Sequence, residues 1–354
     1  MKTFEFESVE ESYPVLLKAL LEEGNDVSPR GMLTKEISPV GITINNPRKR
    51  VISDPNRDSN YGFMIGEFLW MLSGSNDVEH VSHYNKQWLK YTDDNKTLNG
   101  AYGQRIFKWD GLFDIWETKE ETEDGIKSDL HCEHIIMNQF EKAVEQLKKD
   151  PDSRQATIVL FNPVQDYRET KDKPCTNLMR FMIRDGKLNM TVFMRSNDIW
   201  MGYVYDIFNF TMLQEFMAGI LNVEVGKYTH IADSLHLYSD QFDMAKDIIS
   251  NKHNNLYTSE TMDARIPSSD VECELSKVFN IEASTRLNGV LMKTEIVEEM
   301  LKNIKNEYWR SMCALIATYN FRKAKRTQEE MDILFKYVTN EFKDINSKFF
   351  KSLV

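Results

Sequence analysis

The feature that most constrains the fold is a pair of alternating apolar segments joined by Asp185 and Gly186. The segment LMRFMIR precedes this dipeptide, and LNMTVFMR follows it. Asp-Gly suits the two-residue turn of an antiparallel hairpin because that turn requires a positive φ at both positions. Apolar side chains alternate with others in the second segment, at Leu188, Met190, Val192 and Met194. The sequence therefore predicts a hairpin with one buried face and places Arg195 on the other face.

Patterns of the same kind on both sides of the hairpin predict an α+β fold. Apolar residues at helical spacing predict helices over residues 9–20, 61–73, 135–147 and 206–221. Runs typical of strands occur over residues 37–44, 153–162 and 227–237. Together they indicate a mostly antiparallel sheet packed with buried helices. The acidic stretch 110–130 is expected to form a surface insertion.

The last hundred residues differ from the rest. Apolar side chains recur at helical spacing from Ile296 to Tyr319, and Thr327 with Glu330 forms a capping-box pattern. We therefore expect a catalytic domain over residues 1–254 and a helical C-terminal extension over 255–354. Subunit contacts, a partner protein and plain stabilisation are all open roles for this extension.

Charge and composition narrow the class of protein. A net charge of −11 argues against non-specific nucleic-acid binding, which needs a basic surface. The chain lacks the roughly 18-residue apolar run of a membrane span, and its first residues do not resemble a secretory signal, so a cytoplasmic protein is expected. The four cysteines are far apart and predict free thiols. His131, Cys132 and His134 fit no common zinc spacing, so we expect no metal and a helix start at the surface there.

Three side-chain groups outside the hairpin suggest chemistry. Cys175 follows Pro174 at a loop-to-strand junction beside cationic residues, where a thiol of lowered pKa would be a nucleophile. An inert, half-buried cysteine fits the same local sequence. Glu67 lies inside an apolar helix, where a carboxylate must be paired, hydrogen-bonded or used. His236 and Tyr238 lie two apart on a predicted strand, so both can bond one sugar hydroxyl.

The segment MRSNDIWMGYVYDIF carries several polar residues within one strand end and helix start. Arg195 and Ser196 suit a phosphate, because a guanidinium binds bidentately and a hydroxyl donates once more. Taken singly, Asp198 fits a turn former and Asp206 fits a helix start. Their combination is what indicates a site.

Six ordered blocks of this sequence resemble the thymidylate synthase superfamily. They lie between about Pro29 and Phe242, and they are GEFLWMLSG, LNGAYGQR, DSRQATIVLFNP, PCTN, MRSND and SLHLY. Cys-Thr-Asn at 175–177 replaces the Cys-His that is usual in thymidylate synthases, and Asp206 replaces their Asn. Both departures resemble the phage deoxycytidylate hydroxymethylases.

The resemblance implies a thymidylate synthase-like fold and a role for each site residue. Cys175 adds to C6 of the pyrimidine, and C5 then attacks the methylene of the co-substrate 5,10-methylenetetrahydrofolate. The other implied catalytic residues are Glu67, Tyr102 and Asp206. Those implied to bind the nucleotide are Arg30, Arg154, Arg195, Ser196, Asn177, His236 and Tyr238. Those implied to contact folate are Trp88 and Asp198.

The resemblance also implies a homodimer in which Arg154 reaches the partner's site. The second of the family's paired arginines is Gln155 here. A phage source rests on the resemblance alone.

Asp206 favours cytosine on hydrogen-bond grounds. A carboxylate accepts from the N4 amino group of cytosine and from a protonated N3, whereas uracil would place O4 against a second acceptor. Buried polar groups left unmatched in this way cost about 1–3 kcal/mol each. The sequence therefore predicts deoxycytidylate 5-hydroxymethyltransferase activity.

The alternatives are C5 methylation or hydroxymethylation of another pyrimidine monophosphate, including thymidylate synthesis from dUMP, and a non-catalytic nucleic-acid-binding homologue. The ending FFKSLV differs from the short apolar terminus that closes over folate in thymidylate synthases.

Overall fold

The computed structural model describes residues 1–122, 125–250, 262–266, 270–340 and 342. A six-stranded sheet lies at its centre, in the order β1 (Lys2–Phe6), β4 (Val40–Ile44), β11 (Glu224–Ala232), β9 (Lys187–Met194), β8 (Thr176–Arg184) and β7 (Thr157–Val159). The pairs β1–β4 and β9–β11 are parallel, and the other three pairs are antiparallel. The predicted α+β class, a mostly antiparallel sheet with helices and a helical C-terminal part, is confirmed.

The predicted hairpin is β8 and β9. Arg184 pairs with Lys187 across the turn, and Asp185 and Gly186 have φ values of 52° and 71°. The alternate apolar residues of β9 are buried and Arg195 is exposed just beyond it. This hairpin fixes where the sheet ends, and Cys175 and Arg195 lie side by side at that end.

A second sheet has the order β10 (Asn197–Asp198), β12 (Leu235–Tyr238), β3 (Thr34–Ile37) and β2 (Asn25–Val27). The single strands predicted over 37–44 and 227–237 are therefore wrong, because each divides between the two sheets. Pro39 has no N–H and cannot continue a ladder, and the chain turns at Asp233 and Ser234. Apolar alternation persists across both turns, so the sequence pattern cannot show the change of sheet.

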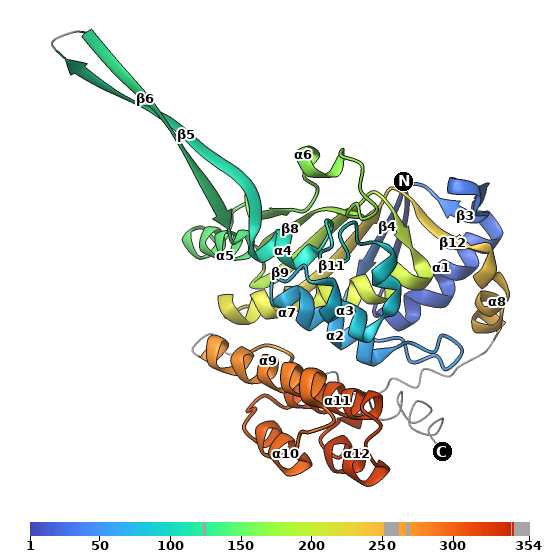
Figure 1. The fold of residues 1–354 in the computed structure, drawn as a ribbon. Helices are drawn as coiled ribbons and strands as arrows, with labels where there is room; N and C mark the ends of the chain where they lie inside the picture. Colours follow the sequence, from blue (N-terminus) through green and yellow to red (C-terminus); the bar gives the residue numbers. More distant parts are fainter. Residues whose placement is uncertain (123–124, 251–261, 267–269, 341, 343–354) are drawn as a thin grey trace.

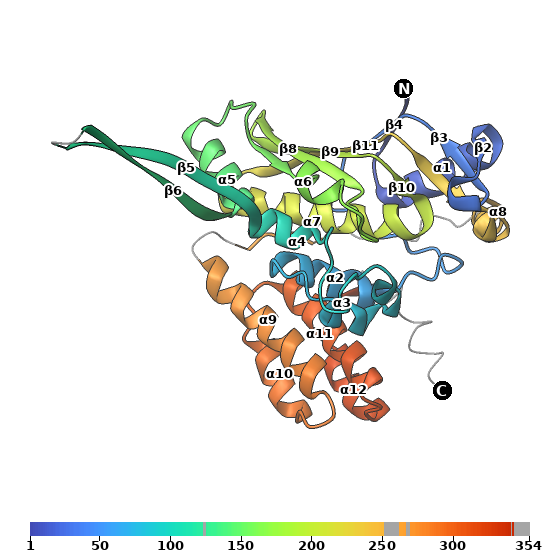
Figure 2. The same cartoon turned by 45° about the horizontal axis from the view of Figure 1, so that its top comes forward.

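Two largely buried helices lie beneath the six-stranded sheet, α7 (Val204–Leu221) and α2 (Tyr61–Leu72), as Figure 2 shows. Phe68 meets Phe208 edge to face, with ring centroids 6.3 Å apart. Both helices were predicted, and both are apolar on nearly all sides because each packs between two layers. The remaining helices of this part are α1 (Val9–Glu23), α3 (Val78–Tyr84), α4 (Tyr102–Phe107), α5 (Gln139–Lys149), α6 (Pro163–Asp166) and α8 (Phe242–Ser250). No helix in the described part of the chain is both long and apolar enough to span a bilayer.

The acidic insertion forms a long two-stranded arm, β5 (Trp109–Thr122) and β6 (Gly125–Met137), which projects away from the rest of the protein in Figure 1. The helix predicted from residue 135 starts only at Gln139, where the Asn138 side chain caps it. The expected helix start at His131 and Cys132 is also wrong, because Cys132 pairs with Ile115 in the arm. Apolar residues at 135 and 136 fit helical spacing, but the strand pairing prevails.

The C-terminal helices α9 (Val271–Asn288), α10 (Thr294–Lys302), α11 (Glu307–Lys323) and α12 (Gln328–Phe335) form a layer against α2 and α3 (Figures 1 and 2). The capping box of Thr327 and Glu330 is confirmed. The ring of Tyr319 lies directly on Gly62 of α2, where a Cβ would overlap it. The predicted boundary at 254/255 and the terminal FFKSLV lie outside the described residues, and that division stays a prediction.

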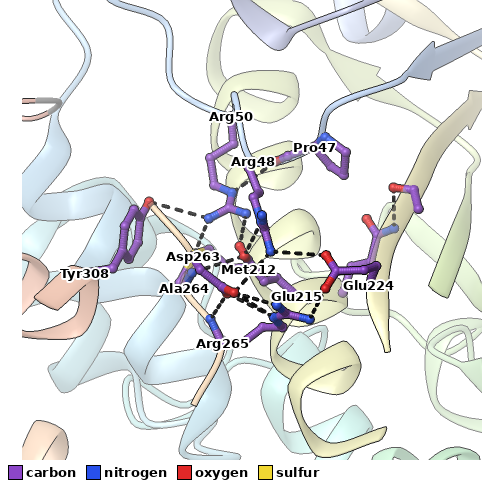
Figure 3. Close-up of polar contacts among 12 residues, drawn as sticks. Pro47, Arg48, Arg50, Met212, Glu215, Glu224, Asp263, Ala264, Arg265 and Tyr308 are labelled. Carbon is purple, nitrogen blue, oxygen red and sulfur yellow. Dashed lines mark hydrogen bonds and ion pairs between the residues drawn. The ribbon is translucent and has the colours of Figure 1, made fainter. Parts of the chain in front are cut away.

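A buried ion cluster joins the segment 262–266 to α7 (Figure 3). Glu215 of α7 is fully buried and bonds both Arg48 and Arg50. It also accepts from the backbone N–H of Ala264, at 3.0 Å. Asp263 pairs in turn with Arg48, at 3.2 Å, and with Arg265. The start of the C-terminal layer is thereby tied to the central helix.

Candidate active site

Cys175 lies directly before β8, at the end of the sheet, and Arg195 is bound to it. The backbone N–H of Arg195 donates to the Cys175 carbonyl at 2.9 Å, and its Nη2 lies 3.6 Å from Sγ. The same guanidinium donates to the carbonyls of Lys173 and Pro174, each at 3.0 Å. The loop carrying the thiol and the start of the MRSND segment are therefore held as one unit.

The pKa of the Cys175 thiol is raised, chiefly by burial. The positive charges of Arg195 and Arg30 lower it, and the negative charges of Asp206 and Asp172 raise it. The expected lowered pKa is thus wrong for the free protein, because desolvation and two carboxylates outweigh two exposed guanidinium groups. These charges also show that Arg30 and Asp206 lie near the thiol.

Two half-buried carboxyl groups lie in this region, those of Asp206 and Glu67. Asp206, in the first turn of α7, accepts from Asn197 Nδ2 at 2.7 Å, and burial with the charge of Asp198 raises its pKa to about 7. Glu67 of α2 accepts from Asn209 Nδ2 at 2.9 Å. Burial and the charge of Asp206 raise the pKa of Glu67 to about 8. Each carboxyl can therefore hold or release a proton near neutral pH.

Tyr102 completes this group from α4. Its hydroxyl accepts from the backbone N–H of Thr176 at 3.2 Å, and its ring stacks on Phe210 at 5.9 Å. Burial, followed by the charges of Asp206 and Cys175, holds the pKa of Tyr102 well above its usual value. Asp206 thus lies close enough to Glu67, Tyr102 and Cys175 to influence the pKa of each.

The expected sugar-binding pair lies at the neighbouring sheet. His236 and Tyr238 meet edge to face, with centroids 5.2 Å apart, and Asp198 pairs in register with His236. Arg30, exposed at φ 55° within the turn η1 (Pro29–Gly31), hydrogen-bonds the Tyr238 side chain. Burial raises the pKa of Asp198. Arg30 therefore lies near both Tyr238 and the Cys175 thiol.

An aromatic surface surrounds Trp88, which lies in η2 (Lys86–Lys90). Its ring lies 6.0 Å from those of both Trp70 and Tyr91, and Tyr91 is exposed. Trp70 is buried and Trp88 is half-buried, and a flat heterocycle such as a pterin can stack on rings at the accessible edge of such a group. The residues present therefore fit the pterin of a folate at this edge of the site.

Of the remaining expected residues, Ser196 and Asn177 are half-buried next to Arg195 and Cys175, but Arg154 is elsewhere. The Arg154 carbonyl accepts from Arg180, five residues along β8 from Cys175, which is roughly 16 Å of strand. Arg154 is exposed and lies away from the thiol of its own chain.

The sequence interpretation missed several positioning residues. Asn197 and Asn209 each donate to a site carboxyl, and His230 bonds Asn197 from β11 (Glu224–Ala232) at 3.2 Å. Asp172 binds the backbone N–H of Gly100 at 2.6 Å beside Cys175. A polar residue facing inward from an apolar strand, as His230 does, was the available signal. Among the described residues no group of three His, Cys, Asp or Glu side chains could hold a metal ion.

A family model described as thymidylate synthase matches residues 11–284, and the chain belongs to that family. A deoxyuridylate hydroxymethyltransferase of Bacillus phage SP01 is 36% identical over 245 residues, which cover 68% of this chain and 60% of that protein. A protein of the same name from Pseudomonas phage M6 is 31% identical over 267 residues, covering 74% of this chain and 69% of that protein. The chain thus spans less than two thirds of the Bacillus phage relative.

Proposed function

We propose that this protein transfers a hydroxymethyl group to C5 of a pyrimidine deoxynucleoside monophosphate, with dCMP as the preferred nucleotide. The convergence of Cys175, Arg195 and Asp206 is the observation that carries the proposal. It combines a nucleophile, an anion-binding guanidinium and a base-reading carboxyl. The names of both phage relatives support a hydroxymethyl product over a methyl one.

Each residue has a chemical task in this reaction. Cys175 Sγ forms a bond to C6, and the electron pair of the C5–C6 double bond makes C5 a nucleophile. The bound 5,10-methylenetetrahydrofolate supplies the one-carbon unit. Glu67 takes the C5 proton, directly or through water beside the Tyr102 hydroxyl, and the bond between the transferred carbon and tetrahydrofolate breaks, which leaves an exocyclic methylene at C5. Water then adds to the exocyclic methylene, and Sγ leaves C6.

Substrate binding falls to the groups around the thiol. Arg195, Ser196 and Arg30 hold the phosphate, since a guanidinium binds it bidentately. His236 and Tyr238 bond the sugar. A phosphate bound to Arg195 neutralises part of the positive charge that favours the Cys175 thiolate.

A specific observation favours dUMP as a second candidate substrate. Burial raises the pKa of Asp206 to about 7, so its neutral form is accessible. A neutral carboxyl has one donor and one acceptor, as an Asn amide has, and it matches O4 and N3–H of uracil. Both phage relatives are named for deoxyuridylate.

We also propose a homodimer in which Arg154 binds the phosphate in the partner's site. Arg154 is exposed and far along β8 from the thiol of its own chain. The test is complementation in mixed dimers: Arg154→Ala and Cys175→Ala chains, each inactive alone, should regain part of the activity when mixed. No regain in a mixture shown to contain heterodimers would refute this role.

The activity is tested by incubating the full chain with dCMP or dUMP and methylenetetrahydrofolate, followed by mass analysis of the nucleotide. We expect 5-hydroxymethyl-dCMP with tetrahydrofolate, and no product from Cys175→Ala. A methyl product with dihydrofolate would indicate a thymidylate synthase instead. Absence of tritium release from both C5-labelled nucleotides would indicate a non-catalytic homologue.

A further inference from the structure

A chain of four hydrogen-bonded side chains leads from the sheet to Asp206. The Tyr228 hydroxyl lies 2.9 Å from His230 Nδ1, and His230 Nε2 lies 3.2 Å from Asn197 Oδ1. Asn197 Nδ2 then donates to Asp206 Oδ2 at 2.7 Å. His230 and Tyr228 are fully buried and Asn197 nearly so, so these groups are out of contact with bulk water.

The donors and acceptors in this series of hydrogen bonds are arranged in one preferred direction, from Tyr228 to Asp206. Burial lowers the pKa of His230 to about 3, so the imidazole is neutral, with one donor and one acceptor. The Tyr228 hydroxyl has no other hydrogen-bond acceptor in the described part of the protein, so its proton goes to Nδ1. His230 must then carry its proton on Nε2 and donate to Asn197 Oδ1. The Asn197 amide is thereby oriented with its NH2 group toward Asp206.

Other groups face Asp206 from the neighbouring elements. Asp198 on β10 adds a negative charge that disfavours its ionised form, and Glu67 on α2 and Tyr102 on α4 respond to its charge. Asn197 is the hydrogen-bond donor to Asp206 among the described side chains. It acts against burial, because a donor stabilises the carboxylate.

We propose that Asn197 and His230 are specificity-determining positioning residues that keep Asp206 a hydrogen-bond acceptor and so favour cytosine over uracil. This inference rests on the proposed function, because it assigns Asp206 to the base. An ionised Asp206 accepts from the N4 amino group and a protonated N3 of cytosine, but it opposes O4 of uracil. A neutral Asp206 accommodates either base. Loss of the hydrogen bonds that link His230, Asn197 and Asp206 should therefore improve binding of uracil relative to cytosine.

The test measures binding of dCMP and dUMP to the full chain at pH 8 by calorimetry without folate, and kcat/KM with folate. His230→Leu removes the donor to Asn197, whereas His230→Gln keeps an amide N–H in that place. Tyr228→Phe removes only the hydroxyl that sets the direction. KM for folate serves as the control for general damage to the site.

We expect wild type to bind dCMP more tightly than dUMP. The ratio of Kd for dUMP to Kd for dCMP should fall at least tenfold in His230→Leu and fall less in Tyr228→Phe. It should stay within threefold of the wild-type ratio in His230→Gln, and KM for folate should be unchanged in all three variants. A ratio unchanged within twofold in a folded His230→Leu protein would overturn the inference, and if that variant does not fold, the same result in Tyr228→Phe would.

If the proposed hydroxymethyl transfer is wrong, the experiment gives a result that differs from failure of the specificity inference. Wild type would then bind nucleotides without forming a hydroxymethyl product, and the binding ratios would still decide the role of Asn197 and His230. Tighter binding of dUMP by wild type, or no binding of either nucleotide, would overturn the inference itself.

Discussion

Arg195 Nη2 lies 3.6 Å from Cys175 Sγ, while the guanidinium also donates to two carbonyls of the loop that carries the thiol. The same side chain thus holds the loop that carries the Cys175 thiol and supplies the positive charge that lowers the pKa of this thiol most. Burial and nearby carboxylates nevertheless keep the pKa of Cys175 raised. The balance of these charges can be altered one residue at a time.

Asp206→Asn should lower the pKa of Cys175, because it removes a negative charge that raises this pKa. Arg195→Ala should raise the pKa of Cys175 further, because it removes the positive charge that lowers this pKa most. The measurement is the rate of iodoacetamide alkylation of Cys175 against pH, with Cys175→Ala as the background. Alkylation profiles that coincide in all three proteins would contradict this electrostatic account.

Glu67→Gln should flatten the dependence of stability on pH. The pKa of Glu67 is raised from 4.5 to about 8, so the folded state binds the more protons between these values. The resulting stability is present below pH 4.5 and is lost as pH rises through 8. Wild type should lose roughly 2–4 kcal/mol more than Glu67→Gln between pH 5 and 9, in urea unfolding. Glu145→Gln, on the exposed side of α5, should retain the wild-type slope.

Arg50→Met should destabilise the protein by about 3 kcal/mol, because it leaves Glu215 buried with one cation fewer. Lys227→Met is the matched control. It breaks an exposed pair with Glu5, so a cost of less than about 1 kcal/mol is expected. Urea denaturation of both variants measures the difference. Equal costs would mean that the cluster in Figure 3 contributes no more than a surface ion pair.

Gly62→Ala should cost about 1–3 kcal/mol, because its Cβ would overlap the ring of Tyr319. Gly41→Ala is the control, since the nearest atom to a Cβ there is the flexible end of Met1, at 3.4 Å. Gly62→Ala should cost much less stability in a Tyr319→Ala background than in wild type, because the ring that its Cβ would overlap is then absent. Additive costs in this double-mutant cycle would refute the close contact.

The parts of the fold that the sequence predicts correctly depend on local rules. The Asp185-Gly186 turn, the alternation in β9 and the capping box at Thr327 each involve residues within a few positions of one another. Long-range pairing decides the rest. Ile135 fits a helix by spacing, but its partner Leu112 makes it a strand residue.

The candidate site likewise has features that the sequence predicts and features that only the fold determines. The ordered blocks identify Cys175, Asp206 and their neighbours, and the structure brings these residues together. The pKa of Cys175 could not be predicted, because the sum of burial and four charges depends on the fold. The link from Asn197 to His230 joins residues 33 positions apart on different sheets, so no local pattern indicates it.

The contact between Gly62 and Tyr319 also has a consequence for synthesis of the protein. The two residues are 257 positions apart in the sequence and in direct contact in the structure. At a translation rate of about 5–20 residues per second, α11 is synthesised roughly 13–50 s after α2. During that interval the part of its apolar surface that α11 covers is open to chaperones and to other nascent chains. The packing of α2 between α7 and the C-terminal layer is therefore complete only after α11 has been made and has docked.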